Sequence, residues 1–122
     1  MQDSKEKMKQ LAKEFANCRT AFTAMGDENR QLIMISLMCH FKGMRVNDIA
    51  QETHLSRPAV SHHLKVLKEA GIVEMYSIGT KNFYHMSGKE ANWKRFTDLI
   101  QHVEKLMNEM SEEERNCGKN DE

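Results

Sequence analysis

Apolar residues between positions 57 and 70 recur at helical spacing and predict a short helix with one narrow apolar face. This face consists of Val60, Leu64 and Leu67. Ser56 can cap the start of the helix, and Gly71 offers a left-handed stop at its end. The opposite face holds small, polar and basic side chains, so we expect the helix to present that face to a partner.

The residues before this helix predict a shorter helix and a tight turn. Residues 46–54 place Ile49 and Ala50 on an inward face, and residues 53–56 turn the chain. Two helices joined by a tight turn, the second with an exposed polar face, form the helix-turn-helix arrangement. Because its second helix enters the major groove of DNA, the pattern predicts a DNA-binding unit.

A β-hairpin is predicted directly after Gly71. Residues 72–77 and 81–86 are rich in β-branched and aromatic residues, and the sequence Ile-Gly-Thr at 78–80 lies between them. A hairpin that follows a recognition helix is called a wing. The predicted fold class is therefore mostly α with a small β-hairpin wing, a winged helix-turn-helix.

Residues 4–25 and 89–111 predict the first and last helices, each with an apolar seam whose members alternate in steps of three and four. Two such seams offer more apolar surface than a small winged-helix core can cover, so we expect a homodimer that pairs through the first and last helices. A monomer with both seams turned inward is the alternative. The predicted dimer interface consists of Leu11, Phe15, Cys18, Phe22, Trp93, Phe96, Ile100, Val103 and Met107.

A further helix is predicted between the first helix and the helix-turn-helix. Asp27 caps its start, it runs to about Phe41, and Gly43 ends it. Its apolar residues lie nearly all round the helix, so we expect it to be central and buried. These residues are Leu32, Ile33, Met34, Ile35, Leu37 and Met38. Residues 44–46 can add a short strand to the wing.

A chain of 122 residues is long enough for a single modest core. We divide it into a winged-helix DNA-binding and dimerisation domain, residues 1–111, and an acidic tail, residues 112–122, which we expect to be disordered. No apolar run approaches the ~20 residues of a membrane span. The first residues lack the apolar core of a signal peptide. We therefore expect a cytoplasmic protein that has no membrane contact.

The net charge is zero, yet the charges are unevenly distributed. Residues 42–85 contain six lysines or arginines against four acidic residues, whereas residues 109–122 contain six acidic residues against two basic ones. The basic excess around the proposed DNA face is slight, so we expect few phosphate contacts. The near-neutral charge also keeps open a second interpretation, a winged-helix module that binds a protein instead of DNA.

Three segments resemble one known family. Residues 55–73, LSRPAVSHHLKVLKEAGIV, are similar to the signature of ArsR/SmtB-type winged-helix repressors. Residues 25–30 resemble the loop and helix start ahead of it, and residues 81–84 resemble the second wing strand. The likeness covers about residues 20–107. It implies a homodimer that binds a pseudo-palindromic operator of double-stranded DNA and represses transcription until an inducer releases it.

The expected DNA contacts lie on the outer face of the recognition helix and at the wing tip. They are Ser56, Arg57, Ser61, His62, Lys65, Thr80 and Lys81. A surface salt bridge with Glu52 is the alternative for Arg57, and plain solvent exposure is the alternative for the wing residues. We expect His63, unlike His62, to be a partly buried structural histidine.

Members of this family often sense metal ions, but the ligand positions of the family are poorly matched here. Residues 44–49 contain no cysteine where one family site has a Cys-Val-Cys-like pattern. On the last helix only Asp98 and His102 share a face, and a carboxylate–imidazole hydrogen bond explains that pair. We expect no metal and no cofactor.

The three cysteines predict no disulfide framework. Cys18 and Cys39 are expected to be small buried residues. A thiol-sensing or redox-sensing member of the family remains an alternative, in which Cys117 would have to reach back to Cys39. No nucleophile and base are placed together and no catalytic motif is present, so we do not expect an enzyme.

Overall fold

The structure is a computed structural model that describes the backbone of residues 4–121 and the side chains of residues 4–112. The elements follow one another as α1 (Ser4–Met25), α2 (Glu28–Met38), α3 (Val46–Thr53), α4 (Arg57–Glu69), β1 (Val73–Ile78), β2 (Lys81–Met86) and α5 (Glu90–Asp121). These helices and the antiparallel hairpin confirm the predicted winged helix-turn-helix fold.

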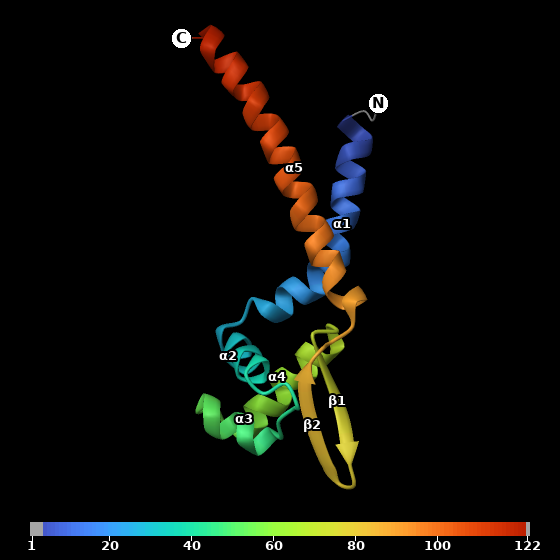
Figure 1. The fold of residues 1–122 in the computed structure, drawn as a ribbon, viewed down its shortest axis with the longest axis vertical. Helices are drawn as coiled ribbons and strands as arrows, with labels where there is room; N and C mark the ends of the chain where they lie inside the picture. Colours follow the sequence, from blue (N-terminus) through green and yellow to red (C-terminus); the bar gives the residue numbers. More distant parts are fainter. Residues whose placement is uncertain (1–3, 122) are drawn as a thin grey trace.

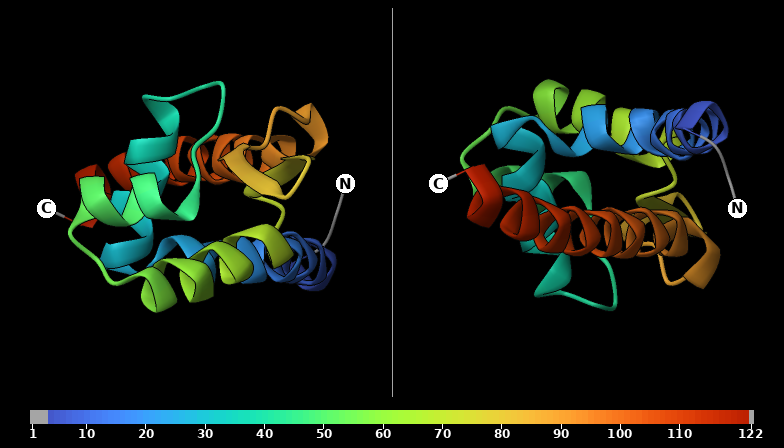
Figure 2. Two further views of the ribbon diagram at one scale, coloured as in Figure 1. Left: turned by 90° about the horizontal axis from the view of Figure 1, so that it is seen from below. Right: turned by 90° about the horizontal axis from the view of Figure 1, so that it is seen from above.

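Different helices and strands form the two ends of the molecule. α1 and α5 lie together near the hairpin and separate toward the two termini, which lie at the same end (Figure 1). α2, α3, α4 and the hairpin form the other end. Seen from that end, α3, α4 and the hairpin lie in front of the two long helices (Figure 2, left). None of the helices in the described part of the chain combines the length and the apolar character of a membrane span.

Local signals begin and end α4 as the sequence predicts. The hydroxyl oxygen of Ser56 accepts a hydrogen bond from the backbone N–H of Ala59 at 3.2 Å, and Pro58 lies in the first turn. After the helix Gly71 has φ +76°, a conformation that costs glycine little. Before it, His54 has φ +60° and turns the chain out of α3. The predicted helix-turn-helix is therefore confirmed.

One cluster of apolar side chains holds α2, α3, α4 and the hairpin together. Its fully buried members include Ile33, Leu37, Ile49, Val60, Leu64, Leu67, Ile72 and Val73. Each such side chain contributes about 1.5–3 kcal/mol relative to an exposed position. The root of α4 is thus fixed in this cluster, which leaves its opposite face in solvent.

The hairpin is a regular two-stranded ladder. Val73 pairs with Met86 at one end and Ile78 with Lys81 at the other, so the turn consists of residues 79–80. Gly79, the first turn residue, has φ +62°, as a type II′ turn requires. The predicted strand at residues 44–46 is reduced to one bridge, in which Met44 and Tyr84 exchange two backbone hydrogen bonds of 2.8 Å.

Two predictions for α2 were wrong. The helix ends at Met38, before Phe41, because residues 39–43 turn back to bring Met44 to the hairpin. It is also buried on one face only: Ile33, Met34 and Leu37 lie in the core, whereas other apolar residues, such as Ile35 at 57% exposure, face solvent. The exposed residues that the sequence placed in the interior are Leu32, Ile35, Met38 and Cys39.

α5 runs to Asp121 and is longer than the predicted helix at 89–111. Its backbone thus continues through the segment that we expect to be a disordered tail, and the division of the chain at residue 111 stays a prediction. The side chain of Cys117 lies outside the described residues.

The apolar seams of α1 and α5 are each divided between two faces. Cys18 and Leu99 are buried where α1 packs on α5, and Leu11 and Leu106 are half-buried nearby. Met25, Trp93, Phe96 and Val103 are also half-buried, and the remaining members of the seams are exposed. We call these exposed residues the outer stripes: Met8, Phe15 and Phe22 on α1, and Ile100, Met107 and Met110 on α5.

Candidate nucleic-acid interface

The outer face of α4 presents polar side chains over a fully buried root. Val60, Leu64 and Leu67 are at most 1% exposed. Because the helix turns by about 100° per residue, the residues on the side opposite this root point outward. The exposed residues at the start of α4 and along this face include Ser56, Arg57, Ser61, His62 and Lys65. The structure therefore brings five of the seven predicted DNA contacts together on one helix.

Two of these residues are further defined by their neighbours. The hydroxyl oxygen of Ser56 is used as the N-cap of α4, so only its hydrogen remains for a phosphate. The carboxylate of Glu52 lies 3.1 Å from Nε2 of His40, and among the described residues it forms no salt bridge with Arg57, which was the alternative for that arginine.

The other two predicted contacts, Thr80 and Lys81, are exposed at the hairpin tip, which protrudes at the lower edge of Figure 1. The ring of Tyr76 stacks on Phe83 with 5.2 Å between the ring centroids, and its hydroxyl donates to the carbonyl oxygen of Lys42 at 2.7 Å. These contacts fasten the hairpin to the loop between α2 and α3, so the wing tip is held in place relative to the core.

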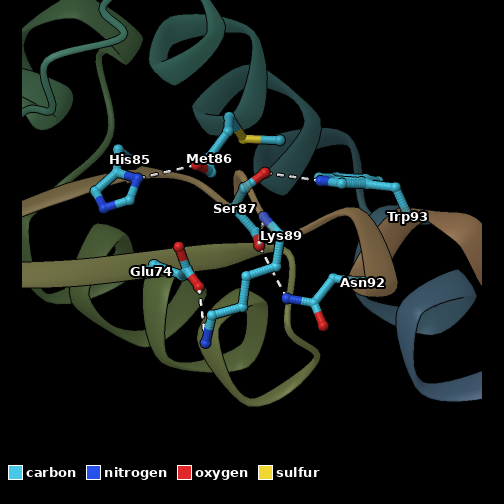
Figure 3. A network of polar contacts seen from close by, with 7 residues as sticks. All are labelled: Glu74, His85, Met86, Ser87, Lys89, Asn92 and Trp93. Atoms are coloured by element: carbon cyan, nitrogen blue, oxygen red, sulfur yellow. Dashed lines mark hydrogen bonds and ion pairs between the residues drawn. The ribbon is translucent and has the colours of Figure 1, made fainter.

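A set of polar contacts around Ser87 joins the wing to α5 (Figure 3). The carbonyl oxygen of Ser87 accepts from Nε1 of Trp93 at 2.7 Å, and its hydroxyl oxygen accepts from Nδ2 of Asn92 at 2.8 Å. The backbone N–H of Ser87 donates to the carbonyl oxygen of Ile72 at 2.8 Å. Ser87 is buried, so these bonds satisfy a polar residue that water cannot reach.

His63 is half-buried, as predicted, and it lies against a residue that the sequence analysis did not single out. Nδ1 of His63 is 3.3 Å from Nη1 of Arg30. Nε of Arg30 donates to the carbonyl oxygen of Ala24 at 2.6 Å, and Nη2 donates to that of Thr23 at 3.3 Å. One guanidinium group thus joins the last turn of α1 to the recognition helix. Arg30 and His63 are 33 positions apart, so no local spacing in the sequence pointed to this contact.

The predicted pair between Asp98 and His102 was wrong. Nδ1 of His102 lies 2.6 Å from the carboxylate of Glu14 on α1, and the Asp98 carboxylate lies 3.1 Å from Nζ of Lys94. The hydrogen bond with His102 lowers the pKa of Glu14 below its usual value. Among the residues whose side chains are described, no three His, Cys, Asp or Glu residues are grouped as a metal would require.

Comparison with known proteins identifies the family. The sequence pattern described as "Bacterial regulatory protein, arsR family" matches residues 27–75. An uncharacterised HTH-type transcriptional regulator of Methanocaldococcus jannaschii is 35% identical over 89 residues, which are 73% of this chain and 89% of that protein. The chain belongs to the ArsR family. As an ArsR-family winged-helix protein it is a DNA-binding transcriptional regulator, and the family is one of transcriptional regulators.

Two further proteins are similar to this chain. The transcriptional repressor SdpR of Bacillus subtilis is 34% identical over 68 residues, 54% of this chain and 71% of that protein. A solved ArsR-like transcriptional regulator from Rhodococcus sp. RHA1 superposes with a TM-score of 0.75 at 20% identity and covers 87% of this chain and 94% of its own. The latter likeness supports the fold.

Proposed function

We propose that this ArsR-family protein is a homodimeric repressor. It places two copies of α4 in successive major grooves of a pseudo-palindromic operator, and an inducer releases it from the DNA. The observation that carries the proposal is the exposed polar face of α4 above a root that is wholly buried. A helix held in this way can enter a groove without giving up its contacts to the core. The repressor SdpR among its relatives supports repression as the direction of control.

The outer stripes of α1 and α5 support the dimer. In each helix one set of apolar positions packs inside the chain, and the outer stripe repeats at about heptad spacing on another face. Two helices of this kind are half of a four-helix bundle, and a second copy related by a twofold axis supplies the other half. Of the predicted interface residues, Phe15, Phe22, Ile100 and Met107 belong to the outer stripes.

The other five predicted interface residues are less available. Cys18 is only 2% exposed in the single chain, so it has almost no surface to give to a partner. Leu11, Trp93, Phe96 and Val103 are half-buried. Trp93 donates its ring N–H to Ser87, and the ring of Phe96 lies 5.2 Å from that of Phe22. These side chains pack within the single chain, beneath the exposed residues of the outer stripes.

The proposed DNA contacts divide into two kinds. Arg57, Lys65 and Lys81 are cations suited to phosphates, which set affinity and register. Ser61 and His62 are short donors on the outer face of α4 and are suited to base edges, which set specificity. Thr80 at the wing tip contacts the backbone beside the groove.

The test begins with selection of binding sites from random duplexes of roughly 30 base pairs. We expect an enriched inverted repeat whose half-sites lie about one helical turn apart, bound by two chains. Lys65→Ala should weaken binding to all sequences alike and reduce the slope of log affinity against log salt by about one. Lys94→Ala, an exposed lysine on α5, is the matched control and should leave both quantities unchanged.

His62→Ala should act differently from Lys65→Ala. It should cost about 1–3 kcal/mol at particular base positions and leave the salt slope nearly unchanged. Enrichment of no inverted repeat would contradict the proposed operator. Operator affinity that is equal in wild type, Lys65→Ala and His62→Ala would show that another face of the protein meets DNA.

A further inference from the structure

The contact between Arg30 and His63 fixes the chemical state of the histidine ring. A guanidinium group has only N–H donors and stays protonated in proteins. Nδ1 of His63, which lies 3.3 Å from Nη1 of Arg30, must therefore be an acceptor without a proton. A neutral imidazole with an unprotonated Nδ1 has its hydrogen on Nε2. The geometry thus requires a neutral His63 in one tautomer.

The charges around His63 act in both directions. Burial is the main cause that lowers the pKa of His63, and the positive charge of Arg30 and the neighbouring His62 lower it further. Asp27, the N-cap of α2, is the group that favours the protonated ring. A proton on Nδ1 would face the N–H groups of Arg30, so the contact cannot survive it.

Arg30 occupies a position from which α4 can be oriented relative to the long helices. Its side chain is held by carbonyl oxygens in the last turn of α1, the negatively polarised end of that helix. Its backbone N–H donates to the Asp27 carboxylate at 3.0 Å. The guanidinium group is therefore fixed from the α1–α2 side, and the remaining contact is to α4.

We propose that Arg30 is a positioning residue for DNA binding, which fixes the orientation of α4 against the end of α1 through the neutral ring of His63, and that this contact is lost when the ring is protonated. This rests on the proposed function, in which α1 pairs the two chains and α4 enters the DNA. Both half-sites must be met at once, so a loosened α4 lowers operator affinity in both chains. Operator binding is then weakened by acid through His63.

The contact itself is tested in the protein without DNA. Long-range ¹H–¹⁵N spectra of the histidine rings distinguish the two neutral tautomers, and a pH titration follows each ring. We expect His63 to be neutral with its hydrogen on Nε2 at about pH 7.5, and to gain a proton at lower pH than an ordinary exposed histidine. A hydrogen on Nδ1 of His63 at that pH would overturn the proposal.

The effect on DNA is measured in a His62→Gln background, because protonation of His62 at the DNA face would itself raise affinity in acid. The probe is a labelled duplex selected by the wild-type protein at about pH 7.5. We expect affinity to fall by about tenfold between pH 7.5 and about pH 5, and by less than about twofold when His63→Gln is added. Equal pH profiles with and without His63→Gln would refute the proposal.

Two comparisons separate positioning from simple stability. Glutamine can accept a hydrogen bond from Arg30 at every pH and leucine cannot, so His63→Gln should bind the duplex about tenfold more tightly than His63→Leu at about pH 7.5. In Arg30→Ala, or in Arg30→Met if the alanine variant does not fold, adding His63→Gln should no longer change the pH profile. If no duplex is selected at all, the proposed function fails together with this proposal, whereas a selected duplex with unchanged pH profiles overturns this proposal alone.

Discussion

His62 and His63 are neighbours in the sequence, yet the helix turns their side chains into different surroundings. His62 is exposed on the outer face of α4, while His63 is half-buried against Arg30. The helical angle alone predicted this division. It could not predict Arg30 as the partner, because the two residues are separated by 33 positions and meet only when α2 packs beside α4. The same holds for Glu14 and His102, which are 88 positions apart.

Glu14 leads to a prediction about acid stability. Its pKa is lowered by the hydrogen bond with His102, so the folded carboxylate binds protons less readily than the unfolded one, whose ordinary value is 4.5. The stability that this contributes is present above that value and is lost as the pH falls through the folded pKa. We therefore expect the free energy of unfolding of Glu14→Gln, measured with urea, to change less than that of wild type between about pH 5 and about pH 3.

The control for this measurement is Glu104→Gln, an exposed carboxylate on α5. It should leave the pH dependence of the unfolding free energy as it is in wild type. If the free energy of unfolding of Glu14→Gln depended on pH as it does in wild type, the Glu14–His102 hydrogen bond would not contribute to the loss of stability in acid.

At the level of elements, the sequence predicted most where local signals and periodicity agree. For α4 the sequence predicted an N-cap, a C-terminal stop and a narrow apolar face made of three residues, and the structure confirmed each of these features. α2 has apolar residues nearly all round, so periodicity could not distinguish its faces. The structure exposes Leu32, Ile35 and Met38 because α3, α4 and β2 cover only the opposite side. The end of α2 was also missed, since a non-local bridge between Met44 and Tyr84 sets it.

The buried root of α4 gives the second prediction. Leu64 is 1% exposed, and its truncation to alanine leaves a cavity in the core cluster. Leu64→Ala should lower the unfolding free energy by about 2–5 kcal/mol. Lys68→Ala, an exposed residue one turn later, should change it by less than about 0.5 kcal/mol. Urea unfolding measures both variants, and similar losses in the two would show that the root of α4 is not the anchor of this helix.

At the scale of the whole molecule, the outer stripes predict that the chain sediments as a dimer. Phe15→Glu or Ile100→Glu would place a charge in an apolar contact at a cost of several kcal/mol. Each variant should therefore sediment with the mass of one chain at micromolar concentration. Thr20→Glu, exposed on α1 outside the outer stripe, is the control and should remain dimeric. A monomeric wild type would rule out the proposed assembly.

The family includes metal sensors, and we predict that this member does not respond to transition metals. A zinc-like ion needs about four N, S or O ligands in tetrahedral reach. The side chains of Asp98 and His102 contact different partners, Lys94 and Glu14, and are therefore not placed to bind one metal ion together. Operator affinity should be the same within about twofold with a chelator or with micromolar zinc, cobalt or nickel. Metal-dependent release of DNA that His102→Ala abolishes would disprove this.

The polar contacts around Ser87, which join the wing to α5, have a consequence for the DNA itself. Only residues 87–89 separate the wing from α5, and the buried Ser87 accepts hydrogen bonds from Asn92 and Trp93 of α5 and donates one to Ile72 beside β1. In a dimer of this kind, the two α4 helices stand at a separation that the protein cannot easily stretch. An operator whose half-sites are slightly too far apart or out of phase must then bend or twist to fit. For the proposed dimer, the stiffness of the base pairs between the two half-sites would thereby become part of what the protein recognises.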